Sequence, residues 1–365
     1  MTIKNITTSL EQWAALSYQE SYDNAGLIVG DSNQLVTGVL ISLDCIEEVI
    51  DEAIRRGCNL VVAHHPIVFR GMKKLNGKSY TERTVIKAIK NDVAIYATHT
   101  NLDNVWGGVN FKIAEILGLG KLQILAPKKQ VIAKLTVFVP KEYSQAVLDA
   151  LFEAGAGHIG NYEHCSFRVE GTGSFSAKLG ANPFIGEVGE IEKVIEDRIE
   201  VVFPVHAERR VVNAMKKAHP YEVPAFYLHV LENENLEVGA GVVGELTQEL
   251  DERDFLAFLK EAMNLPLIRH TALLGARVKK VAVCGGAGSF LLSDAVASGA
   301  DVFVTADYKY HEFFDADGRI IICDIGHYES EVFTKALIHT YLTKKFTNFA
   351  VLLSETSTNP VRYYI

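Results

Sequence analysis

The sequence has few cysteines, and none of them form a closely spaced pair. The five cysteines are scattered over 365 residues, and no two of them form a C-x-x-C arrangement. An odd number of isolated cysteines argues against a disulfide framework and against thiolate metal ligation, and it fits a reducing compartment. We expect most of these residues to be small core side chains: Cys45, Cys58, Cys165, Cys284 and Cys323.

Long apolar runs and basic runs are also missing. No stretch of about 18 apolar residues is present, and the first twenty residues hold no apolar core behind positive charges. The formal net charge is −9 and lysines and arginines do not cluster, so a nucleic-acid backbone has little electrostatic reason to bind. We therefore expect a cytoplasmic protein that binds neither a membrane nor a nucleic-acid backbone.

What is present is the composition of a folded globular protein. Hydrophobic residues make up 48% of the chain and charged residues 22%, which argues against disorder. A chain of 365 residues is long enough for two or three domains, each with its own core.

Short apolar runs alternate with amphipathic segments in the first hundred residues, as in a doubly wound α/β layer. Residues 35–44 predict a strand, 45–57 a helix closed by Gly57, and 59–65 the next strand. A helix at 81–91 and a strand at 92–100 follow. Near the C-terminus, Val/Ile-rich runs predict strands buried on both faces, at 279–286, 301–307 and 319–326.

The pattern changes between these two parts. From "APKKQ" (126–130) to "EVGAGVVGEL" (237–246) the predicted order is βαββαβ, the ferredoxin-like unit. We therefore expect an α/β domain made of residues 1–126 plus 243–365, with a ferredoxin-like domain inserted at 127–242.

Two adjacent histidines end one of the predicted strands, in "NLVVAHHPIVF" (59–69). Adjacent strand residues point to opposite faces, but Pro66 forces a turn in which both His64 and His65 can face one cleft. In open α/β sheets, ligands bind outside the carboxyl ends of the strands. Other strand ends supply further groups of the metal-ligand type: His99, Asp103, Asp307, His311, Asp324, His327, Glu329 and Glu331.

A helix that begins near residue 327 would place His327 and Glu331 at i and i+4, on the same face. Three imidazoles with two carboxylates exceed what one tetrahedral ion uses, so the pattern favours a dinuclear site. Without thiolates, the donor set fits zinc, manganese, iron, cobalt or nickel, and the sequence does not choose among them.

Two glycine-rich motifs are candidates for phosphate binding. "GAGHIG" (155–160) follows a predicted helix, so we interpret it as a helix end running into a loop. "CGGAGSF" (284–290) stands between a strand and a helix; Gly285, Gly286 and Gly288 either hold a phosphate or form a tight turn. Two other pairs of residues either contact a ligand or only stabilise a local turn or loop, and both alternatives stay open: Asp23 with Asn24, and His219 with Tyr221.

Taken together, the motifs resemble the Nif-three-like family, whose members are often called GTP cyclohydrolase I type 2 homologues. The resemblance covers essentially the whole chain and rests on "YDNAGLIVGD" (22–31), "AHHPIVF" (63–69), "THTNLD" (98–103), "CGGAGSFL" (284–291), "TADYKYH" (305–311) and "DIGHYESE" (324–331). The middle segment resembles the PII-like or CutA-like insert of longer bacterial members.

The resemblance implies a site for two metal ions with Glu331 as the bridging carboxylate. Its ligands would be His64, His65, Asp103, His327 and Glu331. It also implies a ring-shaped homohexamer built from dimers, with the metal sites facing an internal cavity.

Two functions are compatible with such a site. The first is a metal-dependent, GTP cyclohydrolase-like hydrolase of a nucleotide, phosphoester or purine ring, with an anionic small molecule or nucleotide as its partner. His99, Asp307 and His311 would then serve as acid, base or positioning groups, or orient the ligands. The alternative is a non-enzymatic metal-handling or regulatory scaffold whose insert senses a small molecule or docks a partner.

Overall fold

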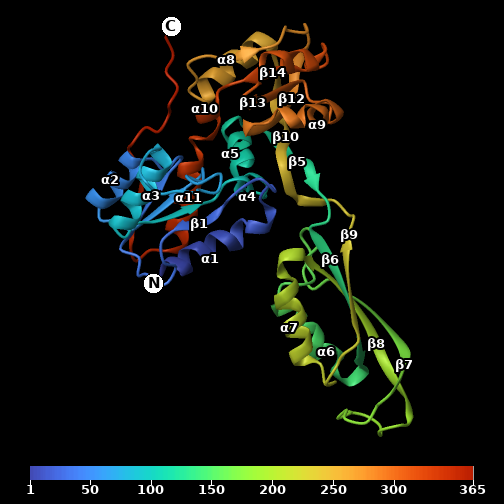
Figure 1. Cartoon of the computed structure of the whole chain (residues 1–365). Helices are drawn as coiled ribbons and strands as arrows, with labels where there is room; N and C mark the ends of the chain where they lie inside the picture. The colour runs from blue at the N-terminus through green and yellow to red at the C-terminus, as the bar shows by residue number, and fades with distance from the viewer. Residues whose placement is uncertain (365) are drawn as a thin grey trace. The chain divides into compact units, whose positions relative to one another are not determined.

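The computed structural model describes residues 1–364 of the chain (Figure 1). The chain divides into two compact units: Met1–Ala126 together with the chain from Glu237 onward, and Pro127–Leu236 between them. Both boundaries fall inside strands, β5 (Gly120–Lys128) and β10 (Asn235–Asp251). The second boundary was predicted at 242/243; β10 is continuous through both 236/237 and 242/243, so no turn marks a domain boundary there.

The first unit contains a five-stranded sheet of order β1-β4-β3-β2-β15. β2 (Gly38–Ser42), β3 (Leu60–Ala63), β4 (Ala94–Ala97) and β15 (Ala350–Leu353) are parallel, and β1 (Gly26–Val29) pairs antiparallel with β4. Their apolar residues form one core with α2 (Glu47–Arg55) and α3 (Tyr80–Lys90). On α1 (Ile3–Trp13) and α11 (Thr334–Lys345), Trp13 and Tyr341 stack. The predicted βαβ arrangement is therefore present.

The same unit contains a six-stranded sheet of order β11-β14-β13-β12-β10-β5. β12 (Arg277–Ala287), β13 (Val302–Ala306) and β14 (Ile321–Asp324) are parallel, as the C-terminal Val/Ile runs predicted. β10 and β11 (Arg269–His270) run antiparallel to their neighbours β12 and β14. The other elements of this half are α8 (Glu252–Ala262), α9 (Leu292–Ala297), η5 (Tyr310–Ala316) and α10 (His327–Glu331).

The second unit has the predicted βαββαβ order. Its elements are, in chain order, β6 (Ile132–Pro140), α6 (Ser144–Glu153), β7 (Phe167–Ser176), β8 (Ile191–Pro204), α7 (Glu208–Ala218) and β9 (Phe226–Leu231). The four strands form one sheet of order β7-β8-β6-β9. Both helices pack on the same face of this sheet, around a core that includes Leu135, Leu151, Val201 and Met215 (Figure 1). The unit therefore has its own hydrophobic core and a ferredoxin-like fold.

Two motifs in this unit are explained by local structure. Gly155 lies just beyond the end of α6 and has a φ of +88°, as is typical of a helix C-terminus. The interpretation of "GAGHIG" as a helix end is therefore confirmed. The His219 Nε2–H donates to the Phe138 carbonyl, and His219 Nδ1 accepts from the Tyr221 amide. Both ring nitrogens of His219 thus fix the loop before β9.

Within residues 1–364, no helix is long and apolar enough to cross a membrane.

The buried carboxylate of Glu52, on α2, holds the chain that follows β15. It is 1% exposed and accepts hydrogen bonds from the Ser354 and Thr356 hydroxyls, the Glu355 and Thr356 amides, and Arg56. Burial alone would raise the pKa of Glu52, but these donors lower it from 4.5 to about 2.

We expect Glu52→Gln to destabilise the protein by about 2 kcal/mol, because several buried donors lose a charged acceptor. Because the folded-state pKa is lowered, the contribution is complete above pH 4.5 and is lost as the pH falls from 4.5 towards 2. Urea unfolding at pH 7 and pH 3 measures both effects. Glu48→Gln, at an exposed position of the same helix, is the control. Equal stability of the two variants at pH 7 would contradict this account.

Candidate metal centre

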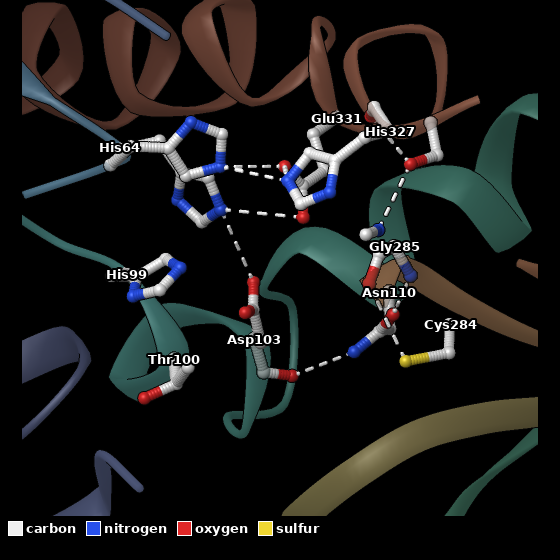
Figure 2. Close-up of polar contacts among 12 residues, drawn as sticks. His64, His99, Thr100, Asp103, Asn110, Cys284, Gly285, His327 and Glu331 are labelled. Carbon is white, nitrogen blue, oxygen red and sulfur yellow. Dashed lines mark hydrogen bonds and ion pairs between the residues drawn. The ribbon is translucent and has the colours of Figure 1, made fainter. Parts of the chain in front are cut away.

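The strand ends of both sheets in the first unit supply one cluster of imidazoles and carboxylates (Figure 2). His64 and His65 follow β3, Asp103 ends the short helix α4 (Thr100–Asp103) after β4, and His327 and Glu331 lie on α10 after β14. The side chains form three groups, and within each group the ligand-type atoms lie within 4.8 Å of one another. The groups are His64, His65 and His99; His65, His327 and Glu331; and His64, Asp103 and Glu331. Residues more than 260 positions apart are thus in contact.

His64 and His65 converge because the strand ends before them. β3 stops at Ala63, and the amides of both histidines donate to the Leu43 carbonyl at 3.0 Å. The backbone is therefore bent at these residues, and the two ring centroids lie 4.9 Å apart. The turn predicted from Pro66 accordingly places both rings in one cluster.

The carboxylate of Glu331 lies among three imidazoles and is 3% exposed. Its Oε2 is 2.8 Å from His65 Nε2 and 3.0 Å from His327 Nε2, and its Oε1 is 3.8 Å from His64 Nε2. His327 and Glu331 have the predicted i, i+4 relation; the helix itself is interrupted at residues 332–333, between α10 and α11. The two oxygens of Glu331 therefore face different histidines.

Two buried atoms of the cluster lack a hydrogen-bond partner among residues 1–364: His64 Nε2 and Asp103 Oδ1. They are 3.6 Å apart, which is too long for a hydrogen bond. Two ligand atoms on one tetrahedral ion, each about 2.0–2.2 Å from it, stand roughly 3.3–3.6 Å apart. The orphaned pair therefore fits a shared cation, whereas buried polar atoms without partners are otherwise costly.

Each of the three imidazoles is oriented through its Nδ1 atom. His64 Nδ1 is 2.8 Å from the Thr98 carbonyl oxygen, His65 Nδ1 is 2.8 Å from Asp44 Oδ1, and His327 Nδ1 is 2.7 Å from Asp307 Oδ2. Because these oxygens accept, each Nδ1 carries a proton and Nε2 is the ring nitrogen that faces the cluster. Such partners fix the rings of metal-binding histidines.

The metal-free cluster holds protons at neutral pH. Burial would lower the pKa values of two imidazoles, but the neighbouring carboxylates raise that of His65 to about 9 and that of His327 to about 11. Burial and the Glu331 charge raise the pKa of Asp103 to about 8. Burial would also raise the pKa of Glu331, but the contacts with the His327, His64 and His65 rings lower it well below its usual range.

The glycines at the end of β12 pack against this cluster. A side chain at Gly286, where φ is +61°, would meet Glu331 Oε1 at 2.4 Å. The Gly286 amide donates to Ser330 Oγ, and the Gly285 amide donates to Asn110 Oδ1 (Figure 2). These amides are therefore already bonded, and the close approach to Glu331 accounts for Gly285 and Gly286 without a phosphate.

A cavity of about 700 Å³ opens beside the cluster. It is formed by residues of the first unit only, and it includes four of the predicted ligands and several aromatic side chains. Residues that line it include Tyr22, His65, Phe69, His99, Asp103, Arg269, Phe290, His327, Glu329, Glu331 and Tyr363. Its size suits a small-molecule ligand.

Of the three residues proposed as catalytic, two lie at the cavity. His99 lines it and donates from Nδ1 to Asp23 Oδ1 at 2.8 Å. Asp307 also lines it, at a φ of +59°, and its carboxylate accepts from His327. His311 lies instead on η5, in ring contact with Tyr310 and Phe314, and is not one of the described residues lining the cavity.

Several residues that support the cluster were missed or left open by the sequence reasoning. Asp44 was missed, although it is the last residue of a predicted strand. Asp23 was left open; its side chain is fully buried and accepts from His99 and from the Thr100 hydroxyl and amide. Asn110 joins the Asp103 carbonyl to the Gly285 amide and carried no local signal (Figure 2).

Comparison with known proteins shows that the chain belongs to the Duf34/NIF3 (NGG1p interacting factor 3) family, which it matches over residues 1–360. It is 42% identical to the "GTP cyclohydrolase 1 type 2 homolog" of Bacillus subtilis (strain 168) over 366 aligned residues. That alignment covers 99% of this chain and 98% of the relative.

Solved structures resemble the whole chain as well. The "Bacillus cereus protein related to NIF3" is 37% identical and superposes with a TM-score of 0.86, covering 100% of this chain and 99% of that one. "Staphylococcus aureus protein SA1388" is 33% identical, with a TM-score of 0.79 and the same coverage.

The shared position of Glu331 leads to a prediction about metal content. We expect Glu331→Ala to lose most of its bound metal, because two of the three ligand groups contain this residue. Glu329→Gln, on the same helix but in none of these groups, serves as the matched control and should keep wild-type metal content. Elemental analysis of the purified proteins measures this. Equal metal in both variants would contradict the assignment.

The protonated state of the free cluster leads to a second prediction. Since His65, His327 and Asp103 hold protons at pH 7, a cation must displace them. We expect the affinity for zinc to rise at least ~10-fold per pH unit between pH 6 and pH 8, because each displaced proton contributes a factor of ten per unit. Calorimetric titration of metal-free protein in buffers of different ionisation enthalpy counts the protons. An affinity independent of pH would refute the protonation pattern.

Proposed function

We propose that the protein is a dinuclear, metal-dependent hydrolase of a nucleotide, phosphoester or purine-ring substrate. The observation that carries this proposal is the Glu331 carboxylate, whose two oxygens face two separate ligand groups. One group would be completed by His64 and Asp103, and the other by His65 and His327. Bound divalent cations would polarise the substrate and lower the pKa of a bound water molecule towards neutrality.

The protein's own residues prepare this chemistry. Asp44 and Asp307 hold His65 and His327 by their Nδ1–H groups, so the rings keep their Nε2 lone pairs directed inward. His99 is held in the same way by Asp23, whose pKa the His99 contact lowers to about 2 although burial opposes it. We assign His99 the transfer of a proton through Nε2 at the cavity wall.

The assembly belongs to the same proposal. As the family resemblance implies, we propose that the chain forms a ring-shaped homohexamer built from dimers in the cytoplasm, with an anionic small molecule or nucleotide as the partner of the cavity. The 42% identity to a protein named "GTP cyclohydrolase 1 type 2 homolog" supports testing nucleotides first.

Turnover by the metal-loaded protein tests the hydrolase. We expect hydrolysis of at least one compound in a panel of nucleosides, nucleotides and phosphoesters. Glu331→Ala should abolish it, and His99→Gln should reduce kcat at least ~100-fold with metal content unchanged. No turnover at full metal occupancy, or equal turnover by Glu331→Ala, would contradict the proposal; the former result would favour a metal-handling scaffold.

A further inference from the structure

The cavity beside the metal cluster is rich in acidic groups. Among the described residues that line it, seven carry carboxylates and one, Arg269, carries a permanent positive charge. Two divalent cations would add four positive charges, so the wall would keep a formal charge of about −2 even when both are bound. The carboxylates are Glu20, Asp44, Asp103, Asp307, Asp324, Glu329 and Glu331.

The one arginine is already engaged by the protein. Arg269 donates to Asp324 at 3.1 Å and to the Tyr308 carbonyl at 3.0 Å, and its guanidinium lies 5.0 Å from the centre of the Phe313 ring. The Gly285 and Gly286 amides are bonded to Asn110 and Ser330. The positive charge of Arg269 is thus already paired, no other arginine or lysine is among the described residues that line the cavity, and the Gly285 and Gly286 amides are not free to hold a phosphate.

Aromatic side chains form another part of the wall. Tyr22 and Phe69 are 60% and 44% exposed, and their ring centroids are 6.1 Å apart. Phe69 also lies 6.2 Å from the ring of His99, which belongs to one of the ligand groups. Phe290 and Tyr363 line the same cavity. A flat ring resting against Phe69 would therefore lie next to the metal cluster.

We propose that the cavity selects a flat aromatic compound with no more than one phosphate, and that it disfavours a triphosphate. This proposal rests on the proposed function, whose substrate class it narrows. One anionic group can meet the cations, where Asp103 and Glu331 leave a local positive charge. A second or third phosphate would face carboxylates with no free cation, whereas a purine ring gains stacking contacts from the aromatic wall.

Calorimetry on the metal-loaded protein, without added magnesium, tests the preference. The probes are guanosine, GMP, GTP and inorganic tripolyphosphate, and the metal content is checked before and after each titration. We expect GMP to bind at least ~10-fold more tightly than GTP, and guanosine to bind more tightly than tripolyphosphate. Tighter binding of GTP or tripolyphosphate than of GMP would overturn the proposal.

Two variants separate the ring contact from the charge. Phe69→Leu should weaken guanosine and GMP by about 5- to 50-fold, while inorganic phosphate binds as before. Tyr310→Leu, an exposed aromatic residue that does not line this cavity, is the control and should leave both unchanged. Glu329→Gln should strengthen GTP several-fold without changing guanosine. Unchanged guanosine binding by Phe69→Leu would also overturn the proposal.

The two proposals fail separately. If no compound is turned over but GMP still binds better than GTP, the hydrolase is contradicted and the cavity preference stands. If GTP is hydrolysed and also binds most tightly, the preference is contradicted and the hydrolase stands.

Discussion

The contact of the Glu331 carboxylate with three imidazoles is the interaction on which the rest of the site depends. It joins α10, which follows β14 of the six-stranded sheet, to the bend after β3 of the five-stranded sheet. A buried carboxylate is costly unless it is paired and hydrogen-bonded, and here it is surrounded by groups that favour its charged form. Removing it would leave the Nε2 atoms of His65 and His327 without this acceptor and would remove a polar link between the two halves of the chain.

The surroundings of this contact show how the fold prepares it. An oxygen atom of Thr98, Asp44 or Asp307 holds the Nδ1 atom of each ring, so Nε2 faces inward before any cation is present. Gly286 allows the end of β12 to approach Glu331 where a side chain would collide. The inserted unit has its own core and contributes no residue to the cavity, so we assign the chemistry to the first unit alone.

Much of this arrangement could be predicted from local patterns. Apolar runs and helix periodicity located the parallel strands. The rule that ligands bind beyond strand ends put His64, His65, Asp103, His327 and Glu331 among the candidates, and the family resemblance singled out these five. The supporting groups were harder to predict because their role depends on tertiary contacts. Asn110 and the Thr98 carbonyl carry no local signal, and His311 follows a strand end like the others but lies in η5, away from the cavity.

Anomalous diffraction from crystals of the protein with its native metal tests the central claim most directly. Data on both sides of the absorption edge should show two peaks, each about 2 Å from its nitrogen ligands. One should lie beside His64 and Asp103, the other beside His65 and His327, with Glu331 between them. A single peak, or peaks elsewhere on a fully loaded protein, would contradict the account.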